Sequence, residues 1–264
     1  VPEFYNFSED VIDKWAKDPE KIAMIWVDDN GNSQERTFLE FSQASKKLAN
    51  VMTLDGVKKG ELIIVLLGRN IEWWDVFTAS LRMGAVLSPG TTQLTAKDIS
   101  YRINASEAVC FITDNENADK FEAIEKECPT IKSKIIVGAP RKGWICFSKS
   151  VEQASDTFAS IHTKMDDKAI VYFTSGTTGF PKMVLHTNEY AFAHNTTGKY
   201  WLDLTPDDLH WNVSDTGWSK AAWSSFFGPW NMGATLFTHF TDRFDPIKTM
   251  ELLETFPIST MCGA

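Results

Sequence analysis

Residues 61–88 read ELIIVLLGRNIEWWDVFTASLRMGAVLS and contain one complete strand–helix–strand pattern. The run Glu61–Leu67 is typical of a strand that is buried on both faces of a parallel sheet. Asn70 can cap a helix over about 72–83, and a glycine ends this helix before a second strand over 85–88. Because two parallel strands must be joined by a crossover, usually a helix, this stretch predicts an α/β fold.

The same alternation continues on both sides of this stretch. Upstream, Thr37-Phe-Leu-Glu40 has the form of a capping box and predicts a helix through about Leu54. Downstream, Thr95-Ala-Lys-Asp98 predicts another helix start, with the helix running to about Asn104. The pattern then continues with strands over 108–113 and 134–137 and a helix over 118–127. The predicted fold class is therefore α/β, with parallel-rich β-sheets flanked by helices.

One segment interrupts the pattern. Residues 138–168 are polar and only weakly periodic, so they predict a surface connection, which could separate two sub-domains. No Gly/Ser-rich linker marks a boundary within it.

The composition is that of an ordinary globular protein of 264 residues, with 43% hydrophobic and 23% charged residues. Its 26 basic residues against 35 acidic ones give a net charge of −9. Such a chain has no global attraction for nucleic acid, although a local basic pocket for a phosphorylated small molecule is compatible with it. The longest apolar run, Leu62–Leu67, is too short to span a bilayer, so we expect a soluble protein without integral membrane contact.

Cysteine usage and the first residues bear on the compartment. The four cysteines form no C-x-x-C pair, which favours reduced thiols in an intracellular protein; they are Cys110, Cys128, Cys146 and Cys262. The N-terminal residues do not resemble a signal peptide, but a chain that starts with Val1 leaves room for a removed transit peptide. The expected location is the mitochondrial matrix or the cytoplasm.

The segment with the clearest chemical content follows a predicted strand over 168–173 and precedes a helical stretch over 187–200. Its glycines permit backbone conformations that let successive N–H groups converge on an anion, and its hydroxyls and lysine add further donors. The predicted ligand is a polyphosphate, bound by Thr174, Ser175, Gly176, Thr177, Thr178, Gly179, Phe180, Pro181 and Lys182. A polar hairpin turn is the alternative reading. A Walker A loop is excluded, because that motif requires Ser or Thr after its lysine and residue 183 is methionine.

The stretch Tyr172–Lys182 resembles the signature loop of the adenylate-forming, or AMP-binding, superfamily. Other segments resemble the medium-chain acyl-CoA synthetase branch of that superfamily, namely residues 1–7, 72–74, 89–95, 214–218 and 263–264. Met183-Val-Leu-His186 departs from the usual pattern of the branch, which we expect to affect local packing rather than phosphate binding.

This resemblance implies roles for individual residues. Thr174–Lys182 would bind the phosphates of ATP, which arrives with Mg²⁺, and Gln93 would contact coenzyme A. The acyl pocket or its gate would include Asp215, Trp218 and Gly263. We assign no catalytic residue, because a carboxylate substrate is already deprotonated at neutral pH, and no metal ligand.

Without the resemblance, two of these regions have simpler interpretations. Residues 89–93 read only as a turn after a strand. The aromatic-rich stretch over 210–230 is more typical of a core than of a pocket, although apolar pockets share such a lining. The five histidines form no ligand pattern and are expected to be hydrogen-bonded or surface residues.

The activity implied by the resemblance is ATP-dependent activation of a medium-chain or branched carboxylic acid. An acyl-adenylate forms first and is then converted to acyl-CoA, with release of pyrophosphate and AMP. Because members of the family are longer than this chain, we expect residues 1–264 to be an incomplete N-terminal AMP-binding domain without the C-terminal domain. The alternative is an ATP- and acyl-binding fragment, or a regulatory truncated isoform, without turnover. The expected partners are a carboxylic acid, ATP and coenzyme A, while acyl preference and oligomeric state stay open.

Overall fold

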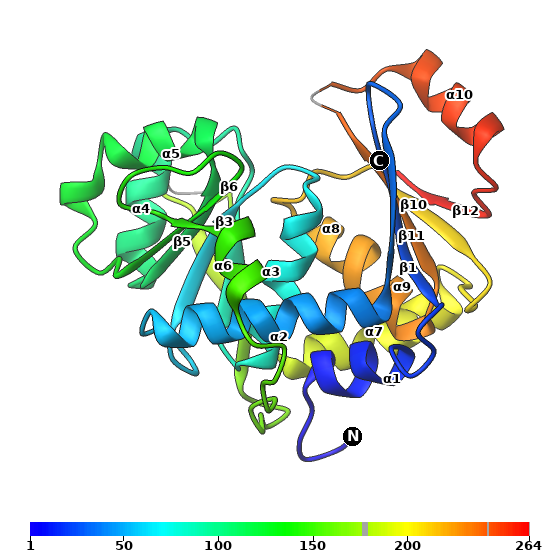
Figure 1. Cartoon of the computed structure of the whole chain (residues 1–264), viewed down its shortest axis with the longest axis horizontal. Helices are drawn as coiled ribbons and strands as arrows, with labels where there is room; N and C mark the ends of the chain where they lie inside the picture. Colours follow the sequence, from blue (N-terminus) through cyan, green and yellow to red (C-terminus); the bar gives the residue numbers. More distant parts are fainter. Residues whose placement is uncertain (176–178, 242, 264) are drawn as a thin grey trace.

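A computed structural model describes residues 1–175, 179–241 and 243–263, which form two β-sheets with helices packed on them (Figure 1). The larger sheet has the strand order β7-β6-β5-β3-β4-β8-β9. Every neighbouring pair in it is parallel except β8 and β9. Its strands are β3 (Leu62–Leu66), β4 (Val86–Pro89), β5 (Cys110–Asp114), β6 (Ser133–Val137), β7 (Ile145–Cys146), β8 (Lys168–Thr174) and β9 (Lys182–Thr187).

The smaller sheet joins the two ends of the chain. Its order is β12-β10-β11-β1-β2, with parallel pairs except for the β1–β2 hairpin. The N-terminal β1 thus pairs with β11, more than 200 residues later in the sequence. Its strands are β1 (Ile22–Asp28), β2 (Ser33–Thr37), β10 (Leu209–Asn212), β11 (Thr235–Phe240) and β12 (Thr260–Cys262).

Helices connect and cover these sheets, and α2 runs along both halves of the molecule in Figure 1. The α-helices are α1 (Asp13–Trp15), α2 (Phe38–Leu54), α3 (Ile71–Arg82), α4 (Ala96–Ser106), α5 (Asn115–Glu122), α6 (Phe147–Gln153), α7 (Asn188–Tyr200), α8 (Ser219–Ala222), α9 (Gly228–Met232) and α10 (Pro246–Thr255). Shorter helical turns cover Ser8–Ile12, Glu125–Glu127 and Trp223–Phe227. The predicted α/β class with parallel-rich, helix-flanked sheets is confirmed.

Both predicted capping boxes are present. At the start of α2, the Glu40 amide donates to Thr37 Oγ1 at 3.2 Å and the Thr37 amide donates to Glu40 Oε2 at 2.7 Å. At the start of α4, Thr95 and Asp98 make the corresponding pair. Asn70 occupies the N-cap position of α3, but its side chain makes no capping hydrogen bond. These reciprocal bonds satisfy backbone donors that a helix start otherwise leaves unpaired.

Three local expectations differ from the structure. The helix predicted over 118–127 starts earlier, at Asn115, because the Asp114 side chain caps it by accepting from the Asn117 amide. The segment 138–168, expected to be a surface connection, also contains β7, which extends the large sheet, and α6, while its place between two sub-domains stays a prediction. The third difference is β9, which was not predicted and forms an antiparallel hairpin with β8.

The aromatic-rich stretch over 210–230 is mostly core. Phe226, Phe227 and Trp230 are fully buried, and the indole N–H of Trp230 donates to the Ala23 carbonyl at 3.1 Å. This pairing allows a large polar-tipped side chain to be buried without an unsatisfied donor. Trp223 is half-buried, and Trp218 is the exposed aromatic residue of the stretch, with 64% of its surface accessible.

His210 provides a pH-dependent contribution to stability. It is fully buried in β10, its Nδ1 lies 2.7 Å from Thr260 Oγ1 in β12, and burial lowers its pKa to about 4. Below about pH 6.5 the unfolded chain therefore binds a proton that the folded chain rejects, so stability falls as the pH falls toward 4.

We expect His210 alone to lower the free energy of unfolding on the order of 2 kcal/mol between pH 7 and pH 5. Urea unfolding at both pH values measures this change. The variant His210→Gln, which cannot titrate, should show a smaller difference between the two pH values than the wild type. An equal difference in both proteins would contradict the assignment.

Candidate functional site

The strongest candidate site lies where the carboxyl ends of strands from both sheets meet. A cavity of about 730 Å³ opens there. The large sheet lines it with the segments after β3, β4, β5 and β6, and the small sheet lines it with those after β10 and β11. Open α/β sheets bind ligands at this edge, because the loops leave the strands there and helix starts face the crevice.

Two residues that were predicted to contact different substrates, coenzyme A and the acyl group, line this same cavity. Gln93 follows β4 and Asp215 follows β10, and both belong to the lining. Their segments touch directly, since a Cβ added at Gly217 would lie 2.0 Å from the Thr91 backbone nitrogen. Thr216 fixes the segment further by donating its hydroxyl to the Leu67 carbonyl at 2.6 Å. The structure therefore brings Gln93 and Asp215 together, about 120 residues apart in sequence.

Two basic residues of this cavity were not predicted from the sequence. Arg69 follows β3 and donates to the Val213 carbonyl at 2.8 Å and the Thr241 carbonyl at 3.3 Å. Burial lowers the pKa of Arg69 and the nearby Asp215 opposes that shift, so the guanidinium keeps its charge. Within the described part of the chain no carboxylate forms an ion pair with it. The sequence around Arg69 contains no motif that would have identified it, because its role depends on carbonyls that are distant in the sequence.

Lys120 is the second of these residues and acts on the Gln93 loop. Its ammonium donates to the Thr92 carbonyl at 2.7 Å and to Asn117 Oδ1 at 2.8 Å. Lys120 therefore connects α5 to Thr92, the residue just before Gln93. The Gln93 side chain is exposed and lines the cavity. Lys120 and Arg69 are the cations of a lining that also contains Asp114, Glu116 and Asp215, so attraction of an anionic ligand is local to these two side chains.

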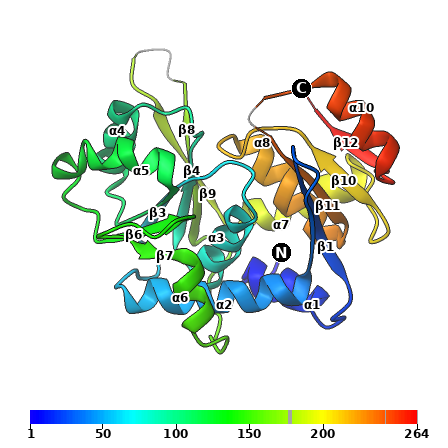
Figure 2. The ribbon, with the colours of Figure 1, turned by 45° about the horizontal axis from the view of Figure 1, so that its top comes forward.

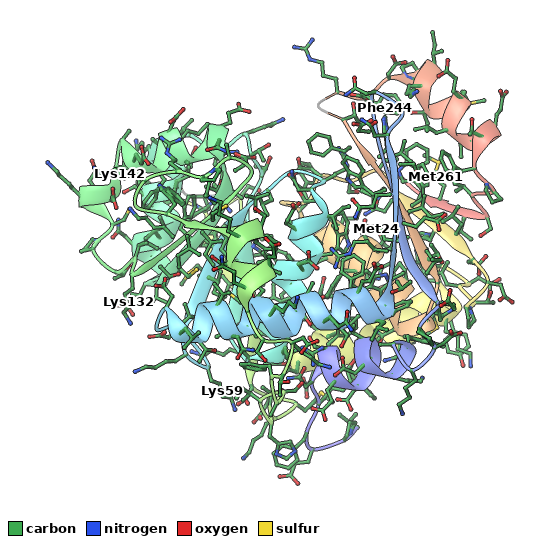
Figure 3. All side chains as sticks on the ribbon, in the orientation of Figure 1. Met24, Lys59, Lys132, Lys142, Phe244 and Met261 are labelled. Carbon is green, nitrogen blue, oxygen red and sulfur yellow. The ribbon has the colours of Figure 1, made fainter. Side chains whose placement is uncertain are left out.

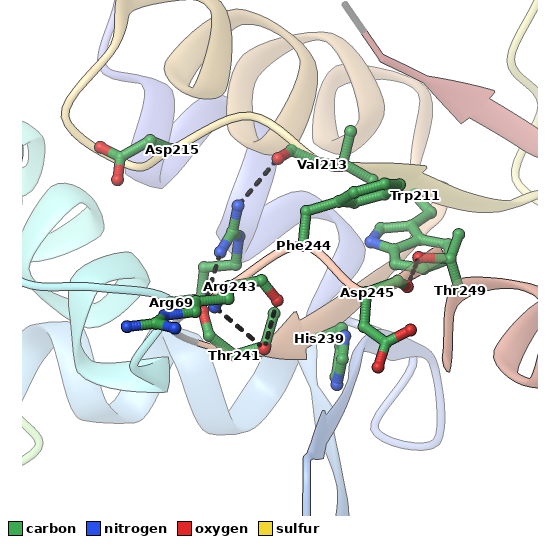
Figure 4. A pocket seen from close by; sticks show the side chains of 10 residues that line it. All are labelled: Arg69, Trp211, Val213, Asp215, His239, Thr241, Arg243, Phe244, Asp245 and Thr249. Atoms are coloured by element: carbon green, nitrogen blue, oxygen red, sulfur yellow. Dashed lines mark hydrogen bonds between the residues drawn. The ribbon is translucent and has the colours of Figure 1, made fainter. Parts of the chain in front are cut away.

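A smaller cavity of about 150 Å³ adjoins the first and shares Arg69 and Asp215 with it (Figure 4). Its opposite wall comes from β11 and the segment after it. His239 in that wall has its Nε2 2.9 Å from Asp29 Oδ1, and burial lowers its pKa. Phe244, which is labelled in Figure 3 and Figure 4, also lines this cavity and is 72% exposed.

Trp218 and Gly263 are close to this region but line neither cavity. Trp218 occupies the N-cap position of α8, after the segment that carries Asp215. Gly263 follows β12, and its carbonyl accepts a hydrogen bond from Lys220 of α8 at 2.6 Å. The ends of β10 and β12 thus place all three predicted acyl-pocket residues in one region, with Trp218 facing solvent.

The predicted phosphate loop joins β8 to β9, and Figure 2 shows the two strands extending beside α4. Gly176, Thr177 and Thr178 lie outside the described residues. Gly179 has φ = +116°, a backbone conformation that residues other than glycine rarely adopt. The described flanks of this segment thus form an antiparallel hairpin, and Gly179 has a backbone conformation that favours glycine.

Helix α4 holds the second half of this loop. The Tyr101 ring stacks on Phe180 with 4.7 Å between centroids, and its hydroxyl donates to the Pro181 carbonyl at 2.9 Å. The described residues of the loop do not line the 730 Å³ cavity. Within the described residues, no group of three or more His, Cys, Asp or Glu side chains is placed to hold a metal ion. None of the helices in that part of the chain is long and apolar enough to cross a membrane.

Comparison with known proteins identifies relatives along the whole chain. Residues 12–264 match the profile described as AMP-binding enzyme. The curated relatives include the mitochondrial acyl-coenzyme A synthetases ACSM3 and ACSM4 of Homo sapiens, at 41% and 40% identity over 100% of this chain and 47% of theirs. ACSM5 of Mus musculus is 38% identical over 99% of this chain. The chain thus spans about half the length of the curated relatives it matches.

Solved structures have the same fold. An acyl-CoA synthetase of Brucella canis superposes with a TM-score of 0.90 over 98% of this chain and 47% of that protein, at 22% identity. The anthranilate CoA ligase AuaEII, solved with anthranoyl-AMP, superposes with a TM-score of 0.84 over 96% of this chain and 48% of that protein, at 20% identity.

Proposed function

Because the chain belongs to the AMP-binding enzyme family, we propose that it contributes the ATP-phosphate, coenzyme A and part of the acyl-binding surfaces of an AMP-forming acyl-CoA synthetase. The reaction is activation of a medium-chain or branched carboxylic acid by ATP·Mg²⁺ to an acyl-adenylate, followed by transfer to coenzyme A. The curated relatives, which are named acyl-coenzyme A synthetases, support the formation of an acyl-CoA, while the medium-chain or branched class of acid rests on the sequence resemblance alone. Their mitochondrial names support a mitochondrial rather than a cytoplasmic location.

The observation that carries this proposal is the placement of the predicted residues at strand ends. The loop 174–182 follows β8, Gln93 follows β4, and Asp215 follows β10. All are carboxyl ends of parallel strands, so ligands of different kinds can approach the same edge of the molecule.

In the first step, a substrate carboxylate oxygen attacks the α-phosphate of ATP, the bond between the α-phosphorus and the β-phosphate breaks, and pyrophosphate leaves. The attacking group is already ionised, so the protein mainly has to neutralise charge on the phosphates and hold the reactants in line. Loop amides and Lys182 would supply donors to the phosphates, and Mg²⁺ bound to ATP would neutralise part of their charge. In the second step, Gln93 would contact coenzyme A, and Arg69 and Lys120 would attract its phosphates.

The coverage of the relatives favours a second candidate. Since the chain spans 47% of each of these relatives, it could bind ATP and an acyl group without completing a turnover. ATP binding by equilibrium titration and ATP–pyrophosphate exchange with hexanoate or octanoate separate the two. Binding together with exchange supports turnover, and binding without exchange supports the second candidate.

We expect Gly179→Val to weaken ATP·Mg²⁺ binding by at least tenfold. Valine is strained at φ = +116°, and the loop backbone must move to relieve that strain. Titration with a fluorescent ATP analogue, displaced by ATP, measures the effect.

The matched control is Gly31→Val in the β1–β2 turn. Gly31 has φ = +82° and, like Gly179, no atom within 4 Å of an added Cβ, so the backbone strain is comparable but distant from the loop. ATP affinity should stay within twofold in this control. The phosphate-loop assignment is wrong if both variants lose ATP affinity equally, or if a folded Gly179→Val protein binds ATP as tightly as the wild type.

A further inference from the structure

A second site lies behind the candidate cleft, between the β1–β2 hairpin, α2, α3 and α6. The structure has there a cavity of about 540 Å³, a size suited to a small organic ligand. It is lined by Trp26, Gln34, Arg36, Ala44, Asn70, Ile71, Glu72, Asp75, Phe147, Ser148, Val151 and Phe240. None of the residues predicted to bind ATP, coenzyme A or the acyl group belongs to this lining.

Among the described residues that line this cavity, one carboxylate has no ion-pair partner. The Arg36 guanidinium makes a two-point ion pair with Asp75, with Nη1–Oδ2 at 2.9 Å and Nη2–Oδ1 at 3.1 Å. That pair is nearly inaccessible to solvent, with 13% of the Arg36 side chain and 4% of the Asp75 side chain exposed. Arg36 is held by Asp75 and forms no ion pair with Glu72, although its positive charge acts on Glu72 from a distance and lowers the pKa of that carboxyl.

Glu72 is the remaining acidic group of the lining. In the described ranges, no basic side chain forms an ion pair with it and no side chain donates a hydrogen bond to it. Burial is the main cause that raises its pKa and the Asp75 charge raises it further, whereas the backbone N–H of Glu72 itself and the Arg36 charge lower it, so that the pKa is raised overall. A cationic ligand would restore the interactions that this carboxylate loses on leaving water.

The other walls favour the same kind of ligand. Trp26, Phe147 and Phe240 supply aromatic surface, and the Trp26 and Phe240 rings lie 5.7 Å apart. The indole N–H of Trp26 donates to the Arg69 carbonyl at 2.8 Å, which fixes the orientation of that ring. Aromatic faces attract ammonium groups as well as apolar bodies.

We propose that this cavity binds a small organic cation, an amine or quaternary ammonium compound with an apolar or aromatic body, through Glu72 and the surrounding rings. The site is separate from the proposed ATP and acyl chemistry but adjoins it, because Asn70 and Phe240 line both this cavity and the larger cleft. A bound cation thus contacts two residues of the cleft wall.

Isothermal titration of the whole chain at pH 7 tests this with three probes of one shape: 2-phenylethylamine, 2-phenylethanol and phenylacetate. We expect the amine to bind at least tenfold more tightly than the acid. Glu72→Gln should weaken binding of the amine at least tenfold, while it should change the affinity for the alcohol less than twofold. Glu152→Gln is the matched control, because it removes an exposed carboxylate from α6 outside the lining and should leave amine affinity unchanged.

A second variant keeps the test decisive if Glu72→Gln does not fold. Val151→Trp fills the cavity from its half-exposed rim and should abolish binding of the amine and the alcohol alike. The proposal is overturned by any of three results. These are no amine binding at millimolar concentration, amine and acid binding equally well, or amine binding unchanged in a folded Glu72→Gln or Val151→Trp protein.

Discussion

Replacing Arg82 with methionine is expected to lower the free energy of unfolding by about 3 kcal/mol. Arg82 ends α3 and is fully buried. Its guanidinium donates to both carboxylate oxygens of Asp13, at 2.7 and 2.9 Å. It also donates to Ser45 Oγ and Ser160 Oγ, each at 2.9 Å. One side chain therefore joins α1, α2, α3 and the segment after α6.

Methionine has a similar length and no donors, so the variant keeps most of the packing and removes the charge-assisted hydrogen bonds. Asp13 then loses its closest cation and keeps only the Ser42 hydroxyl at 2.5 Å and the Lys46 ammonium at 3.9 Å as partners. Burial tends to raise its pKa, whereas the Arg82 hydrogen bonds and charge hold that pKa below its ordinary value in the wild type. Urea unfolding followed by far-ultraviolet circular dichroism measures the loss.

A double-mutant cycle separates the ion pair from simple packing. Asp13→Asn alone should also destabilise the protein, because it leaves the Arg82 charge buried without its partner. If the two residues act as a pair, the double variant loses less than the sum of the single losses. Strict additivity would show that the pair contributes little and that packing accounts for the effect.

Gly217→Ala is expected to disrupt the contact between the two halves of the candidate cleft, at a cost of roughly 3 kcal/mol in stability. The added Cβ would lie 2.0 Å from Thr91 N and 2.4 Å from Gly90 C, so backbone atoms on one side must move. Because the displaced loop carries Gln93, coenzyme A binding should weaken at the same time. Chemical denaturation and equilibrium titration with coenzyme A measure the two effects.

Gly68→Ala is the matched control for this variant. Gly68 lines the same cavity, but a Cβ there meets its nearest atom, Asn70 Oδ1, at an ordinary 3.6 Å. The control should therefore keep stability and coenzyme A affinity close to wild type. A Gly217→Ala protein that behaves like the control would mean that the loop after β4 accommodates a methyl group without moving Gln93.

The parts of the fold that depend on local signals could be predicted from the sequence. The capping pairs at Thr37 and Thr95 require only residues three positions apart, and both form as expected. By contrast, β9 was missed because its Met183-Val-Leu stretch lies exposed on an edge strand and has no alternation of buried and exposed positions. The start of α5 was missed because Asp114 serves both as the last residue of β5 and as a helix cap.

The candidate site likewise contains residues that the sequence predicted and residues that only the tertiary structure identifies. Gln93 and Asp215 could be proposed from motifs, but their common cavity depends on the pairing of distant strands, which no local pattern specifies. Arg69 and Lys120 carry no motif and become candidates only through the carbonyls they contact. The close approach of Gly217 to Thr91 is likewise a tertiary contact, which a sequence of one protein cannot show.

The buried strands and the loops at their carboxyl ends are subject to different constraints on sequence change during evolution. Strands such as β3 are buried along their whole length, so mutations there are constrained by packing. The residues after β4 and β10 lie outside those ladders, and changes in them alter ligand contacts while leaving strand pairing intact. Gly217 is the exception, since its contact ties two of these loops together. We therefore expect lineages with new ligand preferences to vary these loops independently, except at the Gly217–Thr91 junction, where a change in one loop selects for a compensating change in the other.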